Sequence, residues 1–148
     1  MKKGLIVGLL SIEIGFLAGN ILFNKTKIIP SWKRLEKYYF IQEGIYSSYE
    51  NMKKNLANIT TKAIDLEDKK YYVYVGITKR KEIADKIINL YKNKGINVRL
   101  TEKYLSSDEF LQNVLQFDYL LEDKKDEEEI LTIQNVVLAN YEEIIKKE

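Results

Sequence analysis

Two residue types with versatile chemistry are missing from this chain of 148 residues, which contains neither cysteine nor histidine. Without cysteine there is no disulfide, no thiolate nucleophile and no thiolate metal ligand. Without histidine the chain lacks the side chain that most often shuttles protons near neutral pH, and also the commonest metal ligand. We therefore predict that the protein is not an enzyme and that it holds no metal ion and no cofactor.

Proline is nearly absent as well, and acidic residues are scarce in the first two thirds of the chain. Residues 1–105 carry 20 basic and 10 acidic side chains, a net charge of +10, whereas residues 106–148 carry 4 and 12, a net charge of −8. This asymmetry predicts pieces with different surfaces. We divide the chain into a membrane anchor (1–23), a linker (24–37) with the single proline, Pro30, a central domain (38–105) and an acidic helical extension (106–148).

The anchor contains a run of 20 residues, 4–23, with one charge. At about 1.5 Å per residue such a helix spans roughly 30 Å, the thickness of the hydrocarbon core of a bilayer. We predict an uncleaved transmembrane helix; a cleaved signal peptide is the alternative, but "FLAGN" is a poor cleavage site. Lys2 and Lys3 favour an amino terminus inside the cell, so we predict a single-pass membrane protein with its carboxyl-terminal domain outside the cytoplasm.

Small residues share one face of this predicted helix. Its glycines form two G-x-x-x-G pairs, Gly4 with Gly8 and Gly15 with Gly19. Such a face lets two helices approach closely, which predicts a homodimer through the anchor or a contact with another membrane protein. Glu13, on the opposite face, is a further candidate contact because a carboxylate is costly in a bilayer. The alternatives are that glycine is simply common in membrane helices and that local water tolerates one acid.

The central domain contains one unit twice. A shift of 32 positions places Tyr39 on Tyr71 and Gly44 on Gly76, and each copy reads strand, glycine, helix. The patterns predict strands at 38–46, 62–66, 70–77 and 97–104, and helices at 49–59 and from residue 79 to Gly95. We predict an α+β fold of order β-α-β-β-α-β, a four-stranded antiparallel sheet with both helices on one face. One transmembrane helix precedes it and two helices follow it.

A sheet covered on one face leaves the other face open. Strand alternation points Ile41, Val73, Val75, Ile96, Val98 and Leu100 toward the helices. It points Phe40, Gln42, Tyr72, Tyr74, Asn97, Arg99 and Thr101 outward. Aromatic rings beside polar donors suit sugars, or bases that stack. The alternatives are that tyrosine and threonine are merely good strand residues, or that another element covers this face.

The two units resemble the halves of the SPOR (sporulation-related) domain, which typically read "Y-x-V-Q-V-G-x-F…N-A-x-x-L". The first half matches at Gln42, Gly44 and Asn51, and the second at Val73, Val75, Gly76, Ala84 and Gly95. The resemblance implies binding of peptidoglycan glycan strands that lack stem peptides, through the open sheet face. By position, Gln42 matches the glutamine of the family that points outward from the sheet. Tyr74 occupies the outward-facing position between the two valines of the second half. Glu43 departs from the pattern, because the family prefers an apolar core residue there.

The acidic extension contains two amphipathic helices. Ser106 and Glu109 predict a capping box, followed by the apolar stripe Phe110, Val114, Phe117 and Leu121. The second helix has the stripe Ile130, Ile133, Val137, Tyr141 and Ile144. The stripes must pack on the central domain, on each other or on a partner. Helices that covered the open sheet face would compete with any ligand there.

We predict a membrane-anchored, non-catalytic SPOR-like protein of a spore-forming bacterium, binding peptidoglycan in sporulation or cell division. Phe40, Gln42, Tyr72, Tyr74 and Arg99 are the candidate glycan-binding residues. The alternative is a protein–protein interaction scaffold in the same membrane that does not bind glycan. Nucleic acid is not an expected partner, since the aromatic strand motif typical of RNA-recognition modules is missing.

Overall fold

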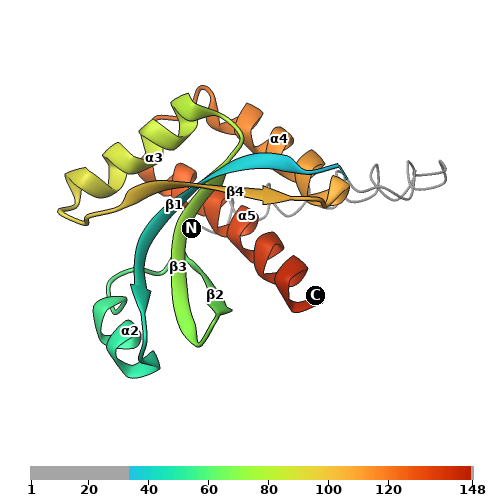
Figure 1. Cartoon of the computed structure of the whole chain (residues 1–148). Helices are drawn as coiled ribbons and strands as arrows, with labels where there is room; N and C mark the ends of the chain where they lie inside the picture. The colour runs from blue at the N-terminus through green and yellow to red at the C-terminus, as the bar shows by residue number, and fades with distance from the viewer. Residues whose placement is uncertain (1–33, 148) are drawn as a thin grey trace.

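Eight elements follow one another in residues 34–147, the part of the chain that this computed structural model describes (Figure 1). They are β1 (Glu36–Tyr46), α2 (Tyr49–Asn55), β2 (Ala63–Glu67), β3 (Lys70–Thr78), α3 (Lys81–Asn93), β4 (Arg99–Leu105), α4 (Asp108–Leu121) and α5 (Glu127–Lys147). The predicted order β-α-β-β-α-β followed by two helices is confirmed. The predicted anchor, 1–23, lies outside the described residues, and none of the helices within 34–147 is long and apolar enough to span a bilayer.

The four strands form one antiparallel sheet of order β2-β3-β1-β4. The two repeats, β1-α2-β2 and β3-α3-β4, therefore interleave, and their first strands pair at the centre of the sheet. Strand boundaries agree with the sequence pattern to within two residues. The first helix is shorter than expected, because it ends at Asn55 and not at residue 59.

Helices α2 and α3 lie on one face of the sheet, as predicted (Figure 1). The close approach of α3 depends on Gly76, the motif glycine of the second repeat. A Cβ atom on Gly76 would meet Cγ2 of Ile87 at 3.0 Å and Cδ1 of Ile41 at 3.3 Å, so α3 lies directly against the backbone of β3. Gly95, with φ of +75°, ends the turn after α3 in a left-handed conformation that favours glycine.

Two irregularities break the register between β1 and β3. The pairing shifts between Ile41 and Gln42 and again between Gln42 and Gly44. The second shift leaves Glu43 without a directly opposed residue on β3. The Tyr46 hydroxyl donates to its carboxylate, whose two oxygens lie 2.9 and 2.8 Å from the hydroxyl oxygen. A β-bulge re-aims a side chain in this way. The bulge thus gives the carboxylate a half-buried, hydrogen-bonded place where the family pattern has an apolar residue.

The opposite face of the sheet is covered by the hairpin of α4 and α5. Helix α4 begins after Ser107, whose hydroxyl accepts a hydrogen bond from the Phe110 amide, so the cap is Ser107 and not the predicted Ser106. The predicted stripes are buried, apart from Ile144, which is half-buried. They share one continuous core with the strands and with α2 and α3.

Candidate functional site

The five predicted glycan-binding residues do not lie together on an open surface. Phe40, Gln42 and Tyr74 are buried, with 0, 6 and 3 % of their surface exposed, because α5 packs over them. Tyr72 is half-buried, and Arg99, at the start of β4, is exposed. The prediction of an open face is wrong for the first three. The physical reason is the apolar stripe of α5, which is buried against the aromatic side of the sheet.

The contact between α5 and the sheet is a cluster of aromatic rings. The Tyr141 ring lies edge-on to Phe40, with 5.0 Å between centroids, and Phe40 lies edge-on to Tyr74 at 4.9 Å. The Lys103 ammonium, from β4, lies 5.1 to 5.6 Å from the centroids of all three rings. Aromatic faces attract a cation at this distance. The surface predicted to take a sugar thus already holds a ring and an ammonium group of the chain itself.

A polar network closes the same contact. The Tyr141 hydroxyl donates to the Asp65 carboxylate at 2.8 Å and accepts from the Lys103 ammonium at 3.0 Å, and Lys103 also pairs with Asp65 at 3.1 Å. Burial raises the pKa of Tyr141 above its usual value, so its hydroxyl stays protonated and able to donate. The network joins the two edge strands of the sheet, β2 and β4, to α5.

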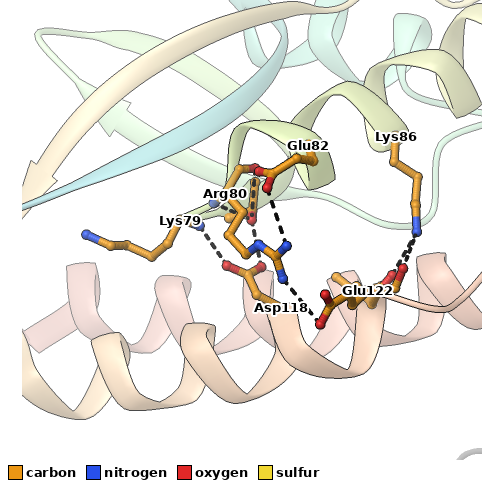
Figure 2. A network of polar contacts seen from close by, with 8 residues as sticks. Lys79, Arg80, Glu82, Lys86, Asp118 and Glu122 are labelled. Carbon is orange, nitrogen blue, oxygen red and sulfur yellow. Dashed lines mark hydrogen bonds and ion pairs between the residues drawn. The ribbon is translucent and has the colours of Figure 1, made fainter.

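Helix α4 is fastened to the other end of the sheet through Asp118 (Figure 2). One carboxylate oxygen accepts from the Thr78 hydroxyl at 2.6 Å and the other accepts from the Lys79 amide at 2.9 Å. Burial raises the pKa of Asp118 to about 6, although both hydrogen bonds favour the charged form. The segment that leads from β3 into α3 is therefore anchored on α4.

Two cations on α3 and its N-cap complete this fastening (Figure 2). Arg80 pairs with Glu122 at 3.5 Å and with Glu82 at 3.3 Å. The Lys86 ammonium donates to the carbonyls of Leu121, Glu122 and Lys124. A cation at the C-terminus of a helix satisfies carbonyls that have no partner within the helix. The end of α4 is thus held from the other side of the sheet.

The interface also contains polar atoms with incomplete hydrogen bonding. Oε1 of Gln134, on α5, accepts from the Ile77 amide at 2.8 Å, beyond the point where β2 stops pairing with β3. Within 34–147, its Nε2 atom and the Tyr38 hydroxyl are buried without a hydrogen-bond partner. Each such group costs about 1–3 kcal/mol relative to a satisfied one. Helix α5 therefore completes the edge of β3 less well than a strand would.

Sequence reasoning missed the residues that fasten the cover, although signals for them were present. Asp65 and Lys103 lie opposite Tyr72 and Tyr38 in the strand register, so they belong to the same face as the predicted site. Asp118 follows Val114 by four positions and therefore lies on the apolar stripe of α4. A charged residue on an apolar stripe predicts a buried polar partner.

The remaining predicted contacts cannot be placed on the fold. Gly4, Gly8, Gly15, Gly19 and Glu13 lie outside the described residues. Within residues 34–147 no group of three acidic side chains is arranged to hold a metal ion.

A solved structure is similar to part of this chain. It is the solution structure of the peptidoglycan binding domain of the B. subtilis cell wall lytic enzyme CwlC, with 22% sequence identity and a TM-score of 0.40. The similarity covers 52% of this chain and 98% of that domain. No family model and no curated protein matches the chain.

Proposed function

We propose that this chain is a non-catalytic, membrane-anchored SPOR-like protein that binds the glycan strands of peptidoglycan in sporulation or cell division. The observation that carries the proposal is the interleaved double unit, with the motif glycine Gly76 against α3 and the motif glutamine Gln42 on the aromatic side of the sheet. The predicted anchor would keep this domain at the outer side of the membrane, within reach of the wall.

Co-sedimentation with purified peptidoglycan tests the proposal. The full chain, in detergent micelles, should sediment with sacculi, and soluble glycan strands without stem peptides should release it. If the chain stays in the supernatant at low and at moderate ionic strength, it does not bind glycan and the proposal is wrong. Protease accessibility of a tag placed after Glu148 on intact cells and on inverted vesicles tests the predicted location outside the cytoplasm.

A protein–protein scaffold is the second candidate, and the burial of Phe40, Gln42 and Tyr74 under α5 favours it. The chain has no cysteine, so single cysteines can report whether this cover opens. Ala63, fully buried opposite Tyr74, reports on the α5 side, and Ala84, fully buried on α3, is the matched control. If glycan binds the covered face, sacculi should accelerate thiol labelling of Ala63→Cys and not of Ala84→Cys. Binding without this acceleration would place the glycan on another surface.

A further inference from the structure

Three tyrosines and a leucine adjoin one another at one end of the sheet, on the face opposite α5. Leu66, Tyr71 and Tyr46 are direct cross-strand partners on β2, β3 and β1, so their side chains form one row on one face. The Tyr49 ring, from the first turn of α2, lies 5.8 Å from the Tyr71 ring. We name these four residues the distal row.

The distal row is accessible to a ligand. Leu66 is 61 % and Tyr49 51 % exposed, and Tyr46 and Tyr71 are half-buried. The row crosses three strands and therefore spans about 10 Å, two strand spacings. Large exposed apolar side chains that adjoin one another mark interaction sites more often than scattered ones do. Tyr104 and Tyr119 are exposed too, but neither makes a ring contact within residues 34–147.

Polar groups border the rings on this surface. The Glu43 carboxylate accepts from the Tyr46 hydroxyl, and the Lys53 ammonium lies 5.5 Å from the centre of the Tyr49 ring. Lys69 lies in the turn between β2 and β3, next to this end of the sheet, and none of the ion pairs found in the described part of the chain involves it. An acidic residue is present as well, Glu50 in the first turn of α2. The row thus combines apolar ring faces with donors and acceptors at its rim.

The chain enters the described part at the opposite end of the sheet. Strand β1 begins at Glu36, opposite Leu105, and ends at Tyr46, opposite Tyr71. With about 3.3 Å per residue, its 11 residues separate the entry point from the distal row by about 35 Å. The 33 residues that precede the described part join at the far end, so the distal row lies at the end of the domain remote from the attachment point of the predicted anchor.

We propose that the distal row is the surface that contacts a peptidoglycan glycan strand while the α4–α5 cover stays closed. This inference rests on the proposed function and names its contact surface. A pyranose ring presents an apolar C–H face and a rim of hydroxyl and N-acetyl groups. The tyrosine rings and Leu66 match that face, and the lysines match the rim and the lactyl carboxylate that recurs on every second sugar when stem peptides are absent.

The test compares two double variants of the full chain in detergent micelles. Tyr49→Ala with Leu66→Ala removes the two most exposed members of the row. Tyr104→Ala with Tyr119→Ala removes two tyrosines elsewhere that are 59 and 73 % exposed. Affinity for sacculi and for soluble stripped glycan should fall about tenfold or more in the first variant and stay within about twofold in the second. Circular dichroism and thermal unfolding establish that both variants are folded.

Three results would overturn the inference, and they separate it from the proposed function. If the distal variant binds as tightly as the wild type, the distal row is not the contact surface, and glycan binds another surface of the chain. Equal weakening of both variants would show nonspecific adhesion of exposed tyrosines. A wild-type chain that does not bind would remove the proposed function together with its surface. Lys53→Gln adds a further check, because it should weaken binding to stripped glycan more than to chitin oligomers, which lack the lactyl carboxylate.

Discussion

Asp118 shows how a single side chain links two parts of this fold. It is a buried carboxylate whose two oxygens satisfy groups at the end of β3, the Thr78 hydroxyl and the Lys79 amide. Arg80 and Glu82 face it from the N-terminus of α3 and act on its pKa in opposite directions. Burial favours the protonated form of a carboxyl group, and at Asp118 burial outweighs the two hydrogen bonds and the Arg80 charge, which favour the ionised form.

The pH dependence of stability should reveal this group. The folded-state pKa of about 6 lies above the ordinary value of 3.8, so the stabilising contribution is fully present below about pH 4 and is lost as the pH rises through 6. Over that window the loss is roughly 2–3 kcal/mol. Melting temperatures measured between pH 5 and 7.5 should fall as the pH rises, and Asp118→Asn, which keeps an acceptor and a donor in place, should flatten the curve. An identical slope in the variant would contradict the assignment.

At the scale of the elements, the packing of α3 on β3 depends on a glycine. The motif glycines Gly44 and Gly76 occupy equivalent places in the two repeats but have different surroundings. A methyl group on Gly76 would meet two core isoleucines, whereas one on Gly44 would meet the outer end of the Tyr46 ring at 3.1 Å. Ile87, beside Gly76, cannot move without shifting α3. The Tyr46 ring, beside Gly44, is half-buried and can rotate away.

We therefore expect Gly76→Ala to lower the free energy of unfolding by about 1–3 kcal/mol through overpacking of α3 against β3. Gly44→Ala is the matched control and should lower it by less. Chemical denaturation of both variants measures the difference. A larger loss in Gly44→Ala would mean that the Tyr46 ring is fixed more firmly than its exposure suggests.

The cover contributed by α5 depends on one ring and its hydroxyl. Tyr141→Phe should lower the free energy of unfolding by about 1 kcal/mol, because Lys103 and Asp65 remain paired with each other. Tyr141→Ala should lower it by about 3–5 kcal/mol, because a cavity opens between Phe40, Tyr74 and Phe110. Urea titrations compare the two. Equal losses would show that the hydroxyl carries the contact and the ring does not.

The elements could be read from the sequence, but their partners across the core could not. Alternation sorted Phe40, Gln42 and Tyr74 onto the correct side of the sheet, since the cross-strand register places them together. It could not show that α5 lies over them, because a strand pattern records which side a residue faces and not what packs there. The bulge at Glu43 was equally hidden, since one extra residue leaves no mark on the local pattern.

At the scale of the whole molecule, the sheet is a central layer with helices on both faces, and the acidic extension is part of its core. The two charge blocks meet across that layer. Lys103, whose carboxylate partner Asp65 belongs to its own block, donates to the Tyr141 hydroxyl, whereas Arg80 pairs with Glu122 and Lys94 pairs with Glu127 across the blocks. The last two are exposed pairs that contribute little to stability each, so the burial of the apolar stripes holds the extension in place.

Removal of residues 106–148 should therefore damage the fold. The truncated chain would expose Tyr38, Phe40, Tyr74 and Ile77, which are buried in the full chain. We expect self-association at micromolar concentration and a clear loss in melting temperature, measured by light scattering and calorimetry. A monomeric, stable truncated chain that binds sacculi more tightly than the full chain would instead identify the extension as a competitor for the sheet face.

The two repeats have unequal helices, 7 residues in α2 and 13 in α3. Helix α3 lies across its own strand, β3, and both neighbours, β1 and β4, while α2 packs mainly on β1. An α2 as long as α3 would extend over β3 and β2 and would cover Tyr71 and Leu66. The shorter α2 leaves Leu66 exposed and Tyr71 only partly covered, so the two repeats end in different surfaces.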